Sequence, residues 1–185
     1  MTIVSVFGSA LPVPGQSSYQ NALELGRLLG KNGFSVMTGG YCGTMEAVSR
    51  GANGAGVNVI GVTCKQIEDY RPSGANVWVT QVHPTDLLSE RIEMLTSQAD
   101  AFIALPGGIG TLAEVAMVFN KMAISSIPSR ILILIGESWK QTFEAFFNSQ
   151  TENVSDHVRN IPKFAKDPQD AVMLLIKSLQ ETQNG

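Results

Sequence analysis

The stretch Ala101–Phe119, AFIALPGGIGTLAEVAMVF, decides how the rest of the chain is interpreted. Its first five residues form a short apolar run that is typical of a buried strand. The run from Leu112 onward is too long and too rich in Ala and Met for a strand, and it predicts a helix. We therefore expect a strand, a glycine loop and a helix in succession.

The residue types of this loop suit the binding of an anion. The first backbone N–H groups of a helix have no partner within the helix, and the helix dipole adds roughly half a positive charge there. Gly107, Gly108 and Gly110 lack a Cβ, so a phosphate can approach these N–H groups closely. Thr111 either caps the helix or gives its hydroxyl group to a phosphate oxygen.

Three interpretations of the loop stay open from the residues alone. Thr111 and Glu114 fit a capping box, which leaves the three glycines unexplained. The GxGxxA spacing from Gly108 to Ala113 fits a dinucleotide fingerprint, with Glu137 near the ribose-binding position, but such fingerprints usually follow the first strand of a fold. A phosphate cradle with a neighbouring carboxylate for a sugar uses every residue of the motif.

Length and composition limit the fold and the partners. With 185 residues, of which 44% are hydrophobic, the chain can bury a sizeable core, and we expect residues 1–185 to form a single domain. The charged fraction of 16% is low and favours an apolar interface, hence a homodimer or a higher homo-oligomer. The formal net charge of −3 argues against nucleic acid as a partner.

The sequence gives no sign of a membrane segment or a metal centre. No apolar run approaches the length of a membrane span, and the N-terminus lacks the basic region of a signal peptide, so we expect a cytoplasmic protein. Cys42 and Cys64 are too far apart for a CxxC site, and His83 and His157 complete no cluster. We expect no disulfide, no metal and no cofactor.

Strand and helix patterns alternate along the chain. They predict strands at 2–7, 34–37, 57–62, 77–82, 101–105, 131–136 and 161–165, and helices that begin near 17, 44, 85, 112, 139 and 168. Ser17 or Ser18 and Thr85 are the expected N-caps, and residues 64–76 are expected to be irregular. The alternation predicts an α/β fold, a Rossmann-like doubly wound sheet that is mostly parallel and carries helices on both faces.

A second glycine loop follows the second predicted strand. Residues 38–43, TGGYCG, hold more glycine than a tight turn requires, and the loop after the first strand begins with Gly8 and Ser9. Loops at the carboxyl ends of neighbouring parallel strands converge on one crevice. We therefore expect Gly39 and Gly40 to share the phosphate site.

Arg91 falls near the apolar side of the helix that is predicted before the motif strand. From the pattern alone, the usual explanation is a salt bridge with Asp86, Glu90 or Glu93 on a solvated face, which would contribute little to stability. His83 has no apparent carboxylate partner nearby and is expected to be a surface or loop histidine.

The motif resembles the PGGxGTxxE signature of the Lonely-guy (LOG) family, phosphoribohydrolases that release a free base from nucleoside monophosphates. Residues 106–114 carry the motif, and residues 7–9, 38–40 and 90–105 agree with its context. The similarity covers about residues 4–148. Many members of this family carry the label lysine decarboxylase.

The resemblance implies roles for individual residues. In the family, the arginine of the helix before the motif strand and the last glutamate of the motif are the catalytic pair, here Arg91 and Glu114. It also implies a dimer through helices near the site. The expected phosphate- and nucleotide-binding residues are Gly8, Ser9, Gly39, Gly40, Gly107, Gly108, Ile109, Gly110 and Thr111.

Three positions depart from the cytokinin-activating members of that family. Those members typically have Lys where this chain has Ile92, Glu where it has Ala113 and Gly where it has Glu46. These departures leave the base open. A related branch of the same fold carries molybdenum cofactor rather than hydrolysing a nucleotide.

We therefore expect a hydrolase that cleaves the N-glycosidic bond of a nucleoside 5′-monophosphate, such as a cytokinin riboside monophosphate or AMP, to a free base and ribose 5-phosphate. The ribose ring gains positive charge in this reaction, which the Glu114 carboxylate can stabilise, while Arg91 neutralises the leaving base or holds the phosphate. The alternative is a non-catalytic carrier of a phosphorylated cofactor such as molybdenum cofactor. Lysine decarboxylation with pyridoxal phosphate is not expected, because neither glycine loop contains a lysine.

Overall fold

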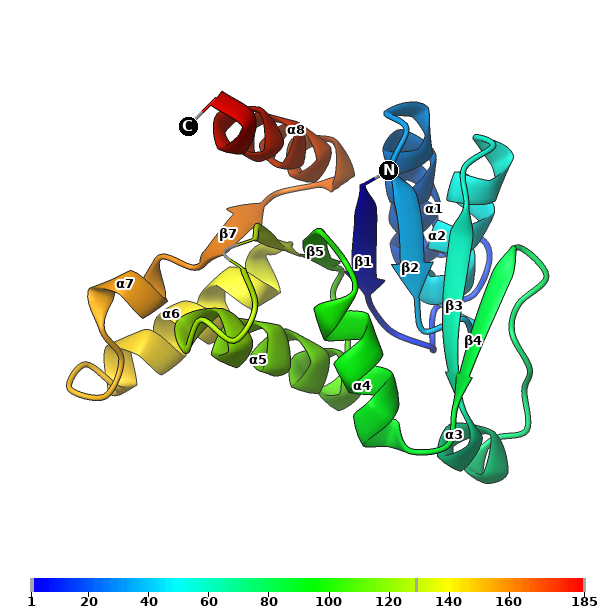
Figure 1. Cartoon of the computed structure of the whole chain (residues 1–185), viewed down its shortest axis with the longest axis horizontal. Helices are drawn as coiled ribbons and strands as arrows, with labels where there is room; N and C mark the ends of the chain where they lie inside the picture. Colours follow the sequence, from blue (N-terminus) through cyan, green and yellow to red (C-terminus); the bar gives the residue numbers. More distant parts are fainter. Residues whose placement is uncertain (1, 129, 185) are drawn as a thin grey trace.

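The computed structural model describes residues 2–128 and 130–184, and one seven-stranded parallel sheet organises them (Figure 1). The strand order is β4-β3-β2-β1-β5-β6-β7, and every pairing is parallel. The chain builds outward from β1 to β4 and then returns to the other side of β1, so the order reverses between β1 and β5. The strands are β1 (Ile3–Phe7), β2 (Ser35–Thr38), β3 (Val59–Cys64), β4 (Gln81–Thr85), β5 (Ala101–Ala104), β6 (Leu132–Ile135) and β7 (Pro162–Ala165).

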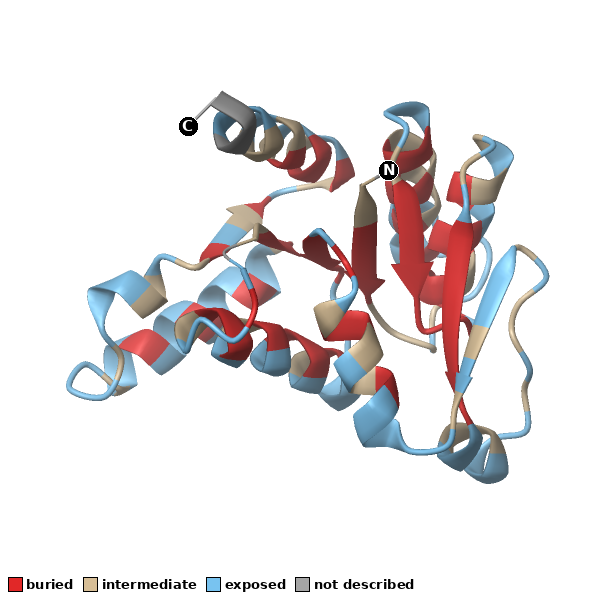
Figure 2. Cartoon of the chain, in the orientation of Figure 1, coloured by how far each residue is buried: buried red, intermediate tan, exposed pale blue. Residues whose placement is uncertain are grey.

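Helices cover both faces of the sheet, which confirms the predicted doubly wound α/β fold. One face packs against α1 (Ser17–Lys31), α2 (Thr44–Gly54) and α8 (Pro168–Asn184). The other packs against α4 (Leu88–Ser97), α5 (Ile109–Ala123) and α6 (Glu137–Ser149). Two short helices, α3 (Lys65–Tyr70) and α7 (Asp156–Arg159), lie in connections. The central strands are buried on both faces (Figure 2), which explains their continuous apolar runs.

Glycines allow α1 and α2 to pack closely against each other. A Cβ on Gly26 would overlap the carbonyl oxygen of Val48, and one on Gly51 would overlap that of Leu23. Any larger residue would push the helices apart. This contact fixes α2, whose first residue belongs to the candidate site.

The segment before β4 differs from the prediction. The strand runs from Gln81 to Thr85 rather than over 77–82, so His83 lies within it instead of after it. Residues 76–79 pack against other parts of the protein instead of pairing in the sheet. The Trp78 ring stacks on Arg50 of α2, and Val79 packs closely on Gly61, where a Cβ would come within 2.9 Å of its side chain. The first part of the region expected to be irregular forms α3.

The expected N-caps are wrong. The N-cap of α1 is Gln16, without a side-chain cap, and Ser17 and Ser18 lie inside the helix. Thr85 belongs to β4, where its hydroxyl donates to the Thr63 carbonyl at 2.8 Å, and α4 begins three residues later. Because the Thr85 hydroxyl is bonded to the neighbouring strand, it does not cap α4.

Two features are absent from residues 2–128 and 130–184. Within them, no helix combines the length and the apolar character that crossing a bilayer would require. The same residues contain no group of three or more His, Cys, Asp or Glu side chains placed to hold a metal ion.

Candidate active site

The predicted site loops meet at the carboxyl ends of β1, β2 and β5, where the strand order reverses. The first two loops are bonded to each other. Thr44, the first residue of α2, donates its N–H and its hydroxyl to the Ser9 carbonyl at 2.8 and 3.0 Å. Gly8 leaves room for this contact, because a Cβ there would overlap the Thr44 hydroxyl. In open α/β sheets this edge is where ligands bind.

The third loop leaves the N-terminus of α5 open. The helix has Gly108 as its N-cap, and no side chain caps it. A Cβ on Gly108 or Gly110 would meet nothing within 4 Å, and the Ile109 side chain is 83% exposed. Among the described residues, the N–H groups of Ile109, Gly110 and Thr111 have no intramolecular partner. The geometry is that of an anion site at a helix N-terminus.

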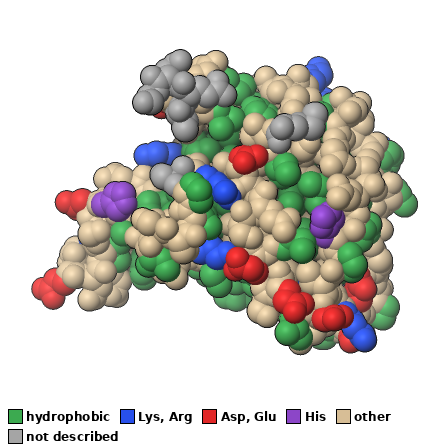
Figure 3. All heavy atoms as spheres, in the orientation of Figure 1, with side chains coloured by type: hydrophobic (Ala, Val, Ile, Leu, Met, Phe, Trp, Pro, Cys, Tyr) green, Lys and Arg blue, Asp and Glu red, His purple; other side chains and the backbone are tan. Residues whose placement is uncertain are grey.

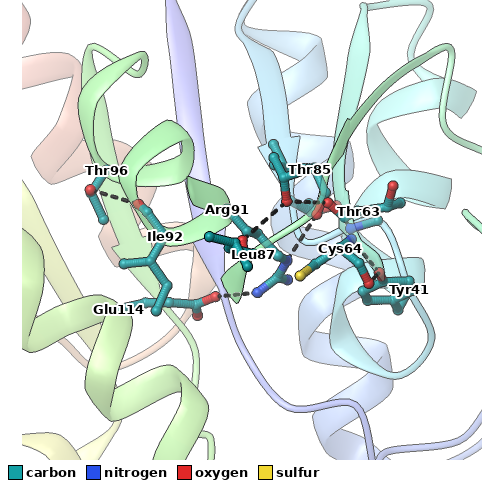
Figure 4. A network of polar contacts seen from close by, with 12 residues as sticks. Tyr41, Thr63, Cys64, Thr85, Leu87, Arg91, Ile92, Thr96 and Glu114 are labelled. Carbon is teal, nitrogen blue, oxygen red and sulfur yellow. Dashed lines mark hydrogen bonds and ion pairs between the residues drawn. The ribbon is translucent and has the colours of Figure 1, made fainter. Parts of the chain in front are cut away.

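Thr111 and Glu114 do not form a capping box. Thr111 is buried beneath Gly107, at which a Cβ would overlap its side chain. Glu114 turns away from the helix start toward Arg91 (Figure 4). The structure therefore excludes the first of the three interpretations of this loop.

Arg91 and Glu114 form a buried ion pair between α4 and α5 (Figure 4). Arg91 Nη1 donates to Glu114 Oε1 at 3.2 Å, and Nε donates to the Val62 carbonyl at 2.9 Å. The two residues are only 6% and 8% exposed. The expected surface salt bridge is wrong: Glu90 accepts N–H groups at the start of α4, and Glu93 pairs with Lys121.

The second glycine loop forms a seat for the Arg91 guanidinium. A Cβ on Gly39 would overlap Arg91 Nη2, and the Arg91 Cζ lies 5.7 Å from the centre of the Tyr41 ring, within cation–π range. Gly40 has φ +78°, and its N–H donates to the Thr38 hydroxyl. Gly39 and Gly40 are both buried. Gly39 packs against Arg91, whereas Gly40 packs against Gly61 and Thr63, and a phosphate contact of either residue stays a prediction.

The position of Tyr41 is fixed by its hydroxyl group. That oxygen accepts the Cys64 N–H at 2.6 Å and lies 3.2 Å from both the Cys64 carbonyl and Glu68 Oε1, either of which can take its proton. Burial raises the pKa of Tyr41 above its ordinary value of 10.0, so the phenol stays neutral. The ring is thereby held flat against Arg91.

Burial also sets the protonation of Glu114. Loss of water contact raises the pKa of its carboxyl group from 4.5 to about 7, against the lowering effect of Arg91. The group therefore changes charge near neutral pH, where a carboxylate can accept a proton or stabilise positive charge. Arg91 is the charge that favours its ionised form.

Two side chains that the sequence analysis missed hold the pair in place. Lys121 Nζ, on α5, donates to Glu93 Oε2 at 2.7 Å and to the Thr96 hydroxyl at 3.0 Å, which joins α5 to α4. Trp139 Nε1 donates to the Leu105 carbonyl at 3.1 Å, directly before the glycine loop. A lysine among the mostly apolar residues 115–123 was the one available signal.

The three departures from the family pattern have separate environments. Glu46 accepts a hydrogen bond from the Tyr19 hydroxyl at 3.1 Å, so it is part of the contact between α1 and α2. Ile92 is half-buried on α4, and Ala113 is exposed on α5. None of the three interrupts the Arg91–Glu114 pair.

Sequence comparisons relate this geometry to known proteins. Residues 1–160 match the model described as the SLOG cluster4 family. The chain is 30% identical over 174 residues to the cytokinin riboside 5′-monophosphate phosphoribohydrolase LOG of Oryza sativa subsp. japonica, covering 92% of this chain and 71% of that protein. LOGL2 of the same plant, a probable enzyme of this type, is 31% identical over 167 residues, with 88% and 66% covered. The chain thus spans about two thirds of their length.

A solved structure with the same fold has a different description. The molybdenum cofactor binding protein from the phototrophic bacterium Rippkaea orientalis superposes with a TM-score of 0.74 at 27% identity, covering 96% of each chain. Proteins similar to this chain are therefore described both as hydrolases and as a cofactor-binding protein.

Proposed function

The chain belongs to the SLOG cluster4 family and is related to the LOG phosphoribohydrolases, and from this premise we propose that it hydrolyses the N-glycosidic bond of a nucleoside 5′-monophosphate. Water adds to the ribose carbon, the bond to the base breaks, and the base leaves with a proton. The products are a free base and ribose 5-phosphate. We propose a purine of the AMP or cytokinin type as the base.

The observation that carries the proposal is the buried Glu114 carboxyl group, one helical turn behind the open N-terminus of α5. The free N–H groups of Ile109, Gly110 and Thr111 bind the phosphate, with Gly8 and Ser9 on the other side of the crevice. This anchor places the ribose near Glu114, where an ionised carboxylate stabilises the positive charge of the transition state or orients water. No metal or cofactor is required for this chemistry.

The position of Arg91 favours one of its two expected roles. Its Nε and Nη1 are bonded within the protein, and Nη2 lies against Gly39. We therefore assign Arg91 to keeping Glu114 ionised and in place, rather than to holding the phosphate. A buried carboxylate without such a partner would stay protonated at neutral pH.

A carrier of a phosphorylated cofactor such as molybdenum cofactor is the second candidate, and the similarity to the Rippkaea orientalis protein favours it. The same helix end would hold the cofactor's phosphate, but a carrier does not need an ionised Glu114. Lysine decarboxylation is not proposed: the lysine nearest in sequence to the motif, Lys121, is engaged with Glu93 and Thr96.

We further propose that the protein is a cytoplasmic homodimer that binds no nucleic acid. Apolar side chains stay exposed on α4, on α5 and at the C-cap of α5: Leu88, Ile109, Met117 and Ile124. Exposed apolar side chains near one site favour an interface with a second copy of the chain. On the face drawn in Figure 3, Lys and Arg side chains are scattered among acidic and apolar ones, unlike a nucleic-acid-binding patch.

A panel of purine, pyrimidine and cytokinin-type monophosphates, each beside its unphosphorylated nucleoside, tests the proposal. We expect the wild type to release base from at least one monophosphate and far more slowly from the nucleoside, and the Glu114→Gln variant to release none. A carrier would cleave no monophosphate in either form, yet would gain thermal stability from a phosphorylated cofactor to the same extent with and without Glu114.

A further inference from the structure

The strap, residues 71–80, connects α3 to β4 and is the least regular part of the β3–β4 crossover (Figure 1). Crossovers between parallel strands are usually helical, but here most of the connection runs as extended chain. Within the strap, Asn76 is half-buried and makes three hydrogen bonds to residues outside the strap. Its partners lie in the second glycine loop.

Three hydrogen bonds join Asn76 to that loop. Its backbone N–H donates to the Gly40 carbonyl at 2.7 Å, and its side-chain Nδ2 donates to the carbonyls of Gly40 and Tyr41 at 2.9 and 3.0 Å. Its Oδ1 accepts the Trp78 N–H at 3.1 Å. Both polar atoms of the side chain are therefore in use, and the amide nitrogen serves the loop alone.

The loop needs this support because its backbone is unusual. Gly40 and Gly43 adopt φ values of +78° and +72°. Because glycine has no Cβ to restrict its rotation, contacts from outside the loop must hold the peptide groups between them. The carbonyls of Gly40 and Tyr41 belong to the same short backbone segment as Gly39 and the Tyr41 ring, which seat Arg91. The hydroxyl contacts of Tyr41 hold the far end of its ring, and the Asn76 bonds hold the backbone from which the ring and Gly39 approach the guanidinium.

We propose that Asn76 is a positioning residue, which holds the second glycine loop so that Gly39 and Tyr41 seat Arg91 against Glu114. Asn76 touches neither Arg91 nor Glu114 and acts on them through the loop. The inference rests on the proposed function insofar as Glu114 must be ionised for hydrolysis. The placement of Arg91 itself can be tested without any substrate.

The strap has a second anchor, which provides a matched control. Asn53, on α2, donates its Nδ2 to the Trp78 carbonyl at 3.2 Å, and Arg50 stacks on the Trp78 ring at 5.4 Å. These contacts hold the strap to α2 without reaching the glycine loop. If Asn76 merely fastened the strap, loss of the Asn53 amide would have the same effect as loss of the Asn76 amide.

The test compares Asn76→Ala and Asn53→Ala by NMR titration of the Glu114 carboxyl group, assigned with Glu114→Gln, in the absence of ligand. We expect the Glu114 midpoint to rise by about one pH unit in Asn76→Ala, because Arg91 no longer stabilises the ionised form, and to stay unchanged in Asn53→Ala. With a monophosphate substrate at pH 7, kcat of Asn76→Ala should fall about fivefold, in proportion to the loss of ionised Glu114, while KM changes little.

The Asn76→Asp variant, which has nearly the same shape as the wild type, shows whether an effect of Asn76→Ala comes from the lost hydrogen bonds or from general unfolding. It keeps the acceptor for the Trp78 N–H but loses the two donated bonds, so it should behave like Asn76→Ala. An unchanged Glu114 midpoint in folded Asn76→Ala and Asn76→Asp would overturn the proposal, as would an equal shift in Asn53→Ala. If the protein cleaves no monophosphate at all, the proposed function fails, whereas the titration still decides the role of Asn76.

Discussion

Replacing Gly39 by alanine should unseat Arg91 without straining the backbone. Gly39 is not among the glycines with positive φ, so alanine can adopt its conformation. The new methyl group would overlap Arg91 Nη2, lie 3.0 Å from Arg91 Cζ and 2.7 Å from Met45 Sδ. Ordinary carbon contacts lie at about 3.5 Å or more, so the guanidinium must move by roughly an ångström or more. The 3.2 Å bond to Glu114 would then be lost.

The consequence is a buried carboxyl group without its counter-charge. In the wild type the pKa of Glu114 is about 7, so about half of the molecules carry the ionised form at neutral pH. Loss of a neighbouring positive charge raises a carboxyl pKa by about one to two units, which leaves only a few per cent ionised. We expect kcat at pH 7 to fall at least about fivefold, and the free energy of unfolding to drop by about 3 kcal/mol as the buried pair is broken.

The assay is a pH–rate profile of base release, recorded together with urea unfolding. The rising limb of kcat should move to higher pH in Gly39→Ala, and activity should partly return in alkaline buffer. Gly54→Ala is the control, because Gly54 lies in α2 with nothing within 4 Å of a new Cβ, and it should leave the profile unchanged. A Gly39→Ala profile that coincides with that of the wild type would refute the assignment of Arg91.

Four further predictions address the rest of the molecule. Gly110→Ala adds a methyl group in open space, so the free energy of unfolding should change by no more than about 1 kcal/mol. The methyl group should weaken monophosphate binding, measured by calorimetry with the nucleoside as the control. An unchanged affinity would mean that the phosphate does not bind at this helix end. Ser5→Ala removes a buried hydroxyl that has no hydrogen-bond partner among the described residues. The free energy of unfolding, measured in urea, should therefore rise by about 1 kcal/mol. A fall in that free energy would mean that the hydroxyl is hydrogen-bonded in the wild type. Glu114 keeps its proton up to about pH 7 in the folded protein, whereas an unfolded glutamate loses it near pH 4.5. The free energy of unfolding should therefore fall by about 3 kcal/mol as the pH rises from 4.5 to 7, relative to Glu114→Gln. Parallel curves of stability against pH for the two proteins would contradict the raised pKa. Ile124→Glu charges a side chain that is 66% exposed at the C-cap of α5 and should convert a dimer to monomers in light scattering. A wild type that is already monomeric would end the dimer proposal.

Local patterns were sufficient to predict the frame of the site. The apolar run before Pro106, the glycines after it and the helix from Leu112 onward are signals carried by consecutive residues, and the structure places β5, an open loop and α5 there. The alternation of such units predicted the parallel sheet, because short connections between parallel strands leave few other arrangements. The sheet in turn brings the loops after β1, β2 and β5 together.

The partners of individual side chains could not be predicted in this way. Arg91 has acidic neighbours in its own helix, yet it pairs with Glu114, 23 residues away, because α4 and α5 face each other across the end of the sheet. The Asn76 side chain reaches the Gly40 carbonyl, 36 residues away. Such contacts depend on how two segments pack, and no periodicity within either segment encodes them. Contacts of this kind also involve residues 77–82, where Trp78 lies against Arg50 and Val79 against Gly61, and β4 begins only at Gln81.

The protonation of Glu114 also depends on tertiary structure. A glutamate in the first turns of a helix is ordinarily exposed and ionised, and the motif gave it a capping role as an alternative. Its raised pKa comes from burial between α4 and α5, and the partial compensation comes from Arg91. Sequence spacing placed the residue, but only packing gives it a titration near neutral pH.

The most direct test of the central claim is the identity of the products formed from one nucleoside monophosphate, resolved by chromatography and mass spectrometry for the wild type and Glu114→Gln side by side. Cleavage of the N-glycosidic bond by the wild type should give free base and ribose 5-phosphate in equal amounts, and the variant should give neither. Nucleoside and inorganic phosphate as products, or equal base release by Glu114→Gln, would contradict the account.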